Sequence, residues 1–351
     1  MPNYVRITDV SPRDGLQNEP GTVPTADKLA LIGHLVAAGV DEVEATSFVS
    51  SKWIPQLADA PQLVERLAYL WSSGEAEGAP EPWPELAASD LPCEFSALVP
   101  NQEGLSAFVA ANINPLAPDI AGGPLGKASI FTAASETFAR KNTNASIAET
   151  IARFEPVVSA AHQRSLVVRG YISCAIACPF EGPTAPEKVA EAAIALSELG
   201  VDELDLADTI GVATPDQIEL MLAAVLDVIG DEWLEASPEG YAPGLTLHLH
   251  DTQGRAAACI KRALEVGVRS FDSAVAGIGG CPYASTPSMR APGNIATELL
   301  VKTIREAGFE SSIDLDRLAI AAAFARSIVE RARVGAASVG GGGAARGSGQ
   351  R

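Results

Sequence analysis

Two histidines, His248 and His250, alternate with leucines in a strand-like segment, Leu245-Thr-Leu-His-Leu-His-Asp-Thr252. Residues two apart on a strand point to the same face, and the whole chain has only four histidines. A single inward histidine is typical of a packed core, whereas two on one face favour a metal site. Imidazoles with carboxylate and amide oxygens suit a divalent cation with open positions, from magnesium or manganese to zinc.

Charged residues end other strand-like segments. Arg13 and Asp14, followed by a glycine, offer a guanidinium and a carboxylate to one ligand, or form a surface salt bridge at a turn. Glu44 lies within an apolar run, where a buried charge needs a partner; an ion pair with Arg13 and a chemical role are equally good interpretations. Asp208 ends another run and is a better site candidate than Asp205, which strand alternation places on the opposite face.

A glycine-rich loop, Val275-Ala-Gly-Ile-Gly-Gly-Cys-Pro-Tyr283, carries a thiol at Cys281. Three glycines within four residues permit close backbone approach and movement, so the thiol is a candidate acid, base or nucleophile. An ordinary glycine turn is the alternative. Beyond the loop, Asn294 could cap a last helix or offer its amide oxygen to a metal. The pair Cys174 and Cys178 lacks a second pair and is interpreted as structural or minor.

Eight short apolar, β-branched runs alternate with amphipathic stretches along the chain. This order favours a (β/α)8 TIM barrel, whose active site lies at the carboxyl ends of its strands. No glycine-rich dinucleotide fingerprint supports an open sheet. We expect strands at 4–10, 40–46, 93–99, 128–133, 166–173, 201–207, 244–250 and 269–275, and helices that include 25–38, 147–162, 186–199, 215–229 and 252–266. An additional C-terminal helix is expected at 313–332, within a catalytic domain of residues 1–333, followed by a glycine-rich disordered tail, 334–351.

Net charge, cysteine content and the distribution of apolar residues limit the kinds of partner and the cellular location that we expect. The 351 residues carry a formal net charge of −19, which makes a nucleic-acid partner an unfavourable expectation. Five cysteines, an odd number in a long chain, favour free thiols in a reducing compartment. We find neither an apolar run of ~18 residues nor a secretory signal pattern, so no membrane association and a cytoplasmic location are expected.

Five motifs together resemble those of 3-hydroxy-3-methylglutaryl-CoA (HMG-CoA) lyases, a family within the metal-dependent TIM-barrel lyases and acyl-CoA condensing enzymes. They occur in the family order across roughly residues 4–310, and the cysteine loop is the most specific. The motifs are Asp9-Val-Ser-Pro-Arg-Asp-Gly-Leu-Gln-Asn-Glu19, Glu44-Ala-Thr-Ser-Phe-Val-Ser50, Asp208-Thr-Ile-Gly211, His248-Leu-His-Asp251 and Val275-Ala-Gly-Ile-Gly-Gly-Cys-Pro-Tyr-Ala284.

The resemblance implies cleavage of HMG-CoA to acetyl-CoA and acetoacetate by a homodimer. It implies that magnesium or manganese is held by Asp14, His248, His250 and Asn294. Arg13 would stabilise the enolate oxygen and Cys281 would take part in proton transfer, with Glu44 and Asp208 as supporting residues. The general base is left open between His248 and Asp14.

Two departures from the family pattern concern the acyl group. Asp205-Leu-Ala-Asp208 stands where Ser-Leu-Gly-Asp is typical, and the 285–293 segment is longer than usual. A lyase for a related branched 3-hydroxyacyl-CoA is therefore an alternative. An isopropylmalate- or citramalate-type condensing enzyme is disfavoured by Thr252 after His-x-His-Asp, and a non-catalytic barrel by the gathered polar residues. Cations near strand ends that could bind CoA phosphates, or be solvated charges, are Lys52, Arg140, Lys141 and Arg255.

Overall fold

The computed structural model describes residues 3–73, 83, 93–113, 122–234, 244–280 and 293–340 of the 351-residue chain. Cys281 and most of the 285–293 segment lie outside the described residues. All structural statements below refer to the described part.

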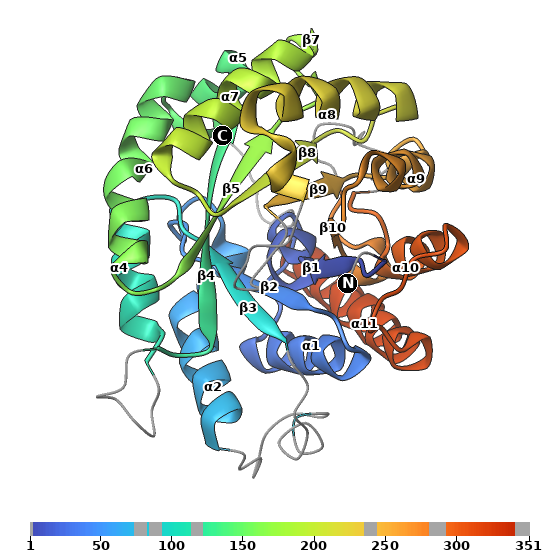
Figure 1. Ribbon diagram of the computed structural model, residues 1–351. Coiled ribbons are helices and arrows are strands. Elements are labelled where there is room, and N and C mark those ends of the chain that lie inside the picture. Colours follow the sequence, from blue (N-terminus) through green and yellow to red (C-terminus); the bar gives the residue numbers. More distant parts are fainter. Residues whose placement is uncertain are drawn as a thin grey trace, which may run out of the picture.

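Eight parallel strands form a closed barrel (Figure 1). The β-branched and apolar runs that predict these strands bury one face under the helices, which is the arrangement of a TIM barrel. The predicted fold is confirmed. In chain order the strands are β1 (Arg6–Asp9), β2 (Glu42–Ser47), β3 (Glu94–Leu98), β4 (Leu125–Ala133), β5 (Val167–Ser173), β8 (Glu203–Asp208), β9 (Leu245–Leu249) and β10 (Ser270–Ser273). A separate two-stranded sheet joins β6 (Ala177–Cys178) to β7 (Gly182–Pro183).

Helices cover the outside of the barrel (Figure 1). They are α1 (Thr25–Ala38), α2 (Ala60–Ser73), α4 (Gln102–Ala111), α5 (Glu136–Thr143), α6 (Ile147–His162), α7 (Pro186–Leu199), α8 (Pro215–Ile229), α9 (Ala256–Val266), α10 (Thr297–Glu306) and α11 (Leu315–Gly340). The predicted bounds of α1, α6, α7 and α8 are confirmed. Left-handed glycines end α1 and α7, at Gly39 (φ 83°) and Gly200 (φ 91°). Among the described residues, no helix is both long and apolar enough to cross a bilayer.

Two helix boundaries differ from the prediction. α9 begins at Ala256 rather than residue 252, because Asp251 Oδ1 accepts a hydrogen bond from Ala256 N (2.9 Å) across a turn with a left-handed Gly254. α11 begins after Asp314, whose carboxylate accepts from the backbone N–H groups of Asp316 and Arg317. It continues to Gly340, so residues 334–340, which the sequence assigned to a disordered tail, are helical.

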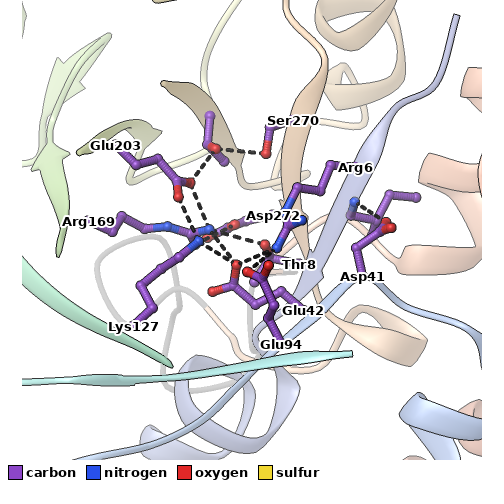
Figure 2. Close-up of polar contacts among 12 residues, drawn as sticks. Arg6, Thr8, Asp41, Glu42, Glu94, Lys127, Arg169, Glu203, Ser270 and Asp272 are labelled. Atoms are coloured by element: carbon purple, nitrogen blue, oxygen red, sulfur yellow. Dashed lines mark hydrogen bonds and ion pairs between the residues drawn. The ribbon is translucent and has the colours of Figure 1, made fainter. Parts of the chain in front are cut away.

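The interior of the barrel is lined by charged side chains, although branched aliphatic layers are the usual filling of this fold. Arg169, fully buried at its centre, makes ion pairs with carboxylates from three other strands: Glu203 (2.7 Å), Asp272 (3.1 Å) and Glu42 (3.3 Å). Lys127, on the neighbouring strand β4, joins Glu42 and Glu203 at 2.6 and 2.7 Å (Figure 2). This network ties β2, β4, β5, β8 and β10 together below the strand ends.

The buried carboxylates of the network keep their charge because cations surround them. Burial alone would raise the pKa of Glu42, but Arg169, Lys127 and Arg6 outweigh it and hold that pKa below its usual value. The pKa of Asp272 is also lowered, because Arg169 and His248 outweigh the effect of burial. Removal of one cation would therefore leave several ionised carboxylates without compensation.

We predict that Arg169→Met lowers the free energy of unfolding by about 3–5 kcal/mol, the cost of removing one partner from a buried ion pair. Urea denaturation at pH 7 measures it. Lys188→Met is the matched control, because the Lys188–Glu191 pair is solvent-exposed; its expected effect is within ~0.5 kcal/mol. Equal effects of the two substitutions would contradict the structural importance assigned to the network.

Candidate active site

The segment after β1 forms a single π-helical turn, Ser11–Gly15, that carries Arg13 and Asp14 to the rim of the barrel. The carbonyl of Val10 accepts hydrogen bonds from the backbone N–H groups of Arg13 (3.1 Å), Asp14 (2.8 Å) and Gly15 (3.2 Å). Gly15 has no room for a side chain, since a Cβ there would lie 2.7 Å from Ile278 Cγ1. The start of the glycine loop therefore packs directly against this turn.

His248 and His250 lie on the inner face at the end of β9, as the strand alternation predicts. Their ring centroids are 5.3 Å apart. A nitrogen from each ring and a carboxylate oxygen of Asp14 all lie within 4.8 Å of one another. The structure thus brings together side chains that are more than 230 positions apart in the chain.

Asn294 completes the cluster. It pairs with His250 through an isolated antiparallel bridge, and its Nδ2 donates to Asp14 Oδ2 (2.9 Å) and the Ile278 carbonyl (3.3 Å). The alternative role of helix cap is wrong: α10 begins at Thr297, and its N-cap residue is Ala296. Asn294 is 3% exposed, yet its Oδ1 has no hydrogen-bond partner among the described residues.

These donors fit a divalent cation. His250 Nδ1 and Asn294 Oδ1 are both buried without a partner in the described part of the chain, and an unpaired buried acceptor is costly unless something binds it. One carboxylate, two imidazoles and an amide oxygen form a mixed nitrogen and oxygen set of the kind that binds magnesium, manganese or zinc. The residues that could hold the metal are therefore those expected from the sequence: Asp14, His248, His250 and Asn294.

His248 is oriented by residues that the sequence reasoning missed. Its Nδ1 lies 3.1 Å from Asp272 Oδ2, which also accepts from the Tyr171 hydroxyl (3.1 Å). Arg169 holds the other oxygen of Asp272. This contact turns Nε2 toward the cluster, as an outer carboxylate does for metal-binding histidines. Period-two alternation in Ser270-Phe-Asp-Ser273 is the signal that could have placed Asp272 inside.

Electrostatics favour Asp14 as an ionised ligand and His250 as a neutral one. Burial alone would raise the pKa of Asp14, but Arg13, both histidines and Asn294 lower it to about 2. Burial, followed by the charge of His248, lowers the pKa of His250 to about 4. A carboxylate and a neutral imidazole are the forms that bind metals.

Arg13 lies beside the cluster in a fixed orientation. Its Nε donates to buried Glu44 and its Nη1 to Asp14 Oδ1 (2.6 Å). Its guanidinium carbon lies 5.5 Å from the centre of the Tyr171 ring, a cation–π contact. The expected ion pair between Glu44 and Arg13 is confirmed. Burial raises the pKa of Glu44 despite this partner.

Asp208 faces the loop after β8, whereas Asp205 points into the barrel. Neither carboxylate contacts Asp14 in the described part of the chain. Asp208 Oδ2 accepts from Ala213 N (2.8 Å), so this carboxylate organises the loop between β8 and α8. Asp205 is fully buried inside the barrel, where its oxygen, a nitrogen of His248 and an oxygen of Asp272 lie within 4.8 Å of one another. Burial and the charge of Asp272 raise the pKa of Asp205 well above its usual value. The sequence ranked Asp208 first; Asp205 lies beside His248, and Asp208 lines a small pocket together with His250.

The four cations expected to bind CoA phosphates differ in setting. Arg255 donates to the carbonyls of Val212 and Ala213, so it supports the β8–α8 loop. Arg140 and Lys141 lie on α5, directly after β4, and Lys141 Nζ is 4.5 Å from the centre of the Phe180 ring. Lys52 is exposed in the loop after β2. Unlike Arg255, the other three cations do not bind the carbonyls of the β8–α8 loop. Binding of CoA phosphates by Lys52, Arg140 and Lys141 stays a prediction.

The described start of the glycine loop shows why glycine is needed there. Gly279 has a φ of 96°, and a Cβ on it would lie 2.8 Å from Asn294 Nδ2 and 3.0 Å from Gly15 Cα. Cys281 itself lies outside the described residues. Cys174 and Cys178 are buried free thiols, and burial raises the pKa of Cys174, which fits the structural interpretation.

We predict that His250 makes the metal-free protein lose stability on acidification. The unfolded state protonates this histidine below about pH 6.5, whereas the folded state does so only near pH 4. The unfolded state therefore binds more protons between these pH values, so the free energy of unfolding decreases as the pH is lowered. Urea denaturation in EDTA should show that wild type loses about 2 kcal/mol more than His250→Gln between pH 7 and pH 5. Equal losses would contradict the buried neutral imidazole.

Comparison with known proteins identifies the family. An HMGL-like family model matches residues 116–324. The chain is 40% identical over 318 residues to the cytoplasmic 3-hydroxy-3-methylglutaryl-CoA lyase of Rattus norvegicus, covering 91% of this chain and 79% of the rat protein. It is similar to the crystal structure of the HMG-CoA lyase from Brucella melitensis (TM-score 0.76, 39% identity, 93% and 99% of the two chains). It is also similar to an Acinetobacter baumannii HMG-CoA lyase in complex with coenzyme A and 3-methylmalate (TM-score 0.75, 31% identity, 94% and 92%). The chain therefore belongs to the HMG-CoA lyases, a family of carbon–carbon lyases.

Proposed function

We propose that this protein cleaves HMG-CoA to acetyl-CoA and acetoacetate, with a divalent metal held by Asp14, His248, His250 and Asn294. The observation that carries the proposal is the convergence of Asp14, His248 and His250 within 4.8 Å at the strand ends. Arg13 lies beside this cluster, in ion-pair contact with Asp14. The relative that was crystallised with coenzyme A and 3-methylmalate supports a site for a CoA thioester and a short hydroxy acid.

A bound magnesium or manganese ion would supply a Lewis acid for the substrate. The side chains of the protein must then accomplish three tasks. The site must remove a proton from the tertiary hydroxyl, stabilise the enolate of the thioester, and then protonate the enolate carbon. Each of these tasks falls to side chains of this chain.

Arg13 is suited to the enolate oxygen. Two of its nitrogens, Nε and Nη1, are held by Glu44 and Asp14, and Nη2 has no partner among the described residues. This leaves the N–H groups of Nη2, on a fixed and permanently charged group, for the developing negative charge. Glu44 thus serves by orienting Arg13.

Geometry favours His248 over Asp14 as the general base. A carboxylate whose pKa lies near 2 stays ionised, which suits metal ligation more than proton abstraction. Asp272 contacts His248 Nδ1 and would stabilise an imidazolium if Nε2 took the proton. A metal-bound Nε2 cannot take that proton, so His248 is the base only if Asp14, His250 and Asn294 hold the metal without it. Metal titration of His248→Ala separates the two roles. Cys281 is proposed as the acid that protonates the enolate carbon.

A lyase acting on a related branched 3-hydroxyacyl-CoA is the second candidate, because Asp205 lies near His248 on the floor of the site. A homodimer and a cytoplasmic location are further proposals. The location is supported by a relative named cytoplasmic, although others are named mitochondrial.

Product formation tests the proposal. Protein loaded with magnesium or manganese should release acetoacetate and acetyl-CoA from HMG-CoA, and EDTA should abolish the activity until metal is restored. A parallel assay with other branched 3-hydroxyacyl-CoA thioesters identifies the acyl group. If the metal-loaded, folded protein released no acetoacetate while cleaving another thioester, the second candidate would replace the first.

We predict that Arg13→Gln lowers kcat about 10²–10³-fold, the usual effect of losing one oxyanion donor. Affinity for Mn²⁺ should not fall, because removal of the guanidinium takes a competing cation away from Asp14. Steady-state kinetics and manganese titration measure the two effects separately. Weaker manganese binding with an unchanged kcat would show that Arg13 serves the metal site and not the enolate.

A further inference from the structure

The C-terminal helix α11 lies outside the eight strand–helix units and packs beside α1 (Figure 1). Its buried face includes Ala325, Ile328 and Val329. Farther along, the helix reaches the 16–24 segment that follows the Arg13–Asp14 turn. The approach is close: a Cβ on Gly21 would lie 2.2 Å from the carbonyl oxygen of Ala332.

An ion pair joins the helix to this segment. Arg333 Nε donates to Glu19 Oε2 (2.8 Å) and its Nη2 to Glu19 Oε1 (3.0 Å), a two-point contact between residues 314 positions apart. Glu19 is only 1% exposed, so this carboxylate needs compensation by nearby donors. The planar fork of an arginine fixes the carboxylate in orientation as well as in charge.

The 16–24 segment also contacts Asp14, one of the candidate metal ligands. Gln17, two residues before Glu19, donates from Nε2 to Asp14 Oδ1 (2.7 Å). Leu16, directly before Gln17, is buried, and its carbonyl accepts a hydrogen bond from Glu19 N (3.1 Å). On the other side, the Glu19 carbonyl accepts from Gln56 Nε2 (2.7 Å). The carboxylate held by Arg333 is therefore connected to Asp14 through the backbone of residues 17–19 and the Gln17 side chain.

We propose that Arg333 is a positioning residue for the active site: through Glu19 it fixes the 16–21 segment and thereby the orientation of Asp14. The inference rests on the proposed function only in assigning Asp14 to the metal. It makes α11 part of the catalytic scaffold, although the helix contributes no residue to the site itself.

Arg333→Gln tests this in the full-length protein, with Arg331→Gln as the matched control. Arg331 lies on the same helix and pairs with Asp27 at the surface (2.8 Å), away from the 16–21 segment. Electron paramagnetic resonance titration with Mn²⁺ should show about 10-fold weaker binding for Arg333→Gln, the usual loss when an outer-shell contact is removed. Arg331→Gln should bind like wild type. Arg333→Lys, which keeps the charge without the fork, should give an intermediate affinity.

A double-mutant cycle locates the effect. If Arg333 acts through Glu19, the losses of Glu19→Gln and Arg333→Gln should not add in the double variant. Unchanged manganese affinity in Arg333→Gln, or a lower melting temperature with normal affinity, would overturn the proposal. If Arg333→Gln did not fold, the manganese affinity of Arg333→Lys would test the proposal: an affinity equal to that of wild type would overturn it. Absence of HMG-CoA cleavage by wild type would refute the proposed function alone, because the manganese titration does not depend on turnover.

Discussion

Buried charge must be compensated, and this constraint organises the structure from the centre of the barrel to its rim. Arg169 lies at the centre and holds carboxylates from three strands, with Lys127 bridging two of them. Such pairs add little net stability relative to an apolar filling, but removing one partner is costly. Their value is therefore positional: each carboxylate has one arrangement in which its charge is satisfied.

The same compensation reaches the metal-binding candidates through one residue. Asp272 accepts from Arg169 on one oxygen and contacts His248 with the other. A charge fixed at the core thus sets the ring orientation of a rim histidine, and Tyr171 links Asp272 to the face of Arg13. At the rim, Asn294 Oδ1 and His250 Nδ1 have no partner among the described residues. A cation bound beside them would accept their lone pairs and satisfy both atoms.

The sequence predicted what is local and periodic. His248 and His250 were found from strand alternation, and Arg13 and Asp14 from their place after β1. Contacts between distant strands left no local signal, so the partner of His248 was missed although Asp272 lies in a predicted strand. The ion pair between Glu19 and Arg333 joins the two ends of the chain, and no periodicity relates them. The position of Asp208 at a strand end does not reveal that one oxygen of its carboxylate accepts from the backbone of the loop that follows.

Asp205 shows how a barrel can accept a carboxyl group beside its site without changing the reaction. An oxygen of Asp205 lies within 4.8 Å of one of Asp272, and burial beside Asp272 raises the pKa of Asp205 well above its usual value. The raised pKa favours the protonated form, which adds no charge to the interior of the barrel. Arg169 compensates Asp272, and Asp272 contacts His248. What the substitution alters is the shape and polarity of the floor beneath the histidines. Under the proposed function, Asp205 would affect which acyl group fits, whereas Arg13, Asp14 and the histidines would carry the carbon–carbon cleavage.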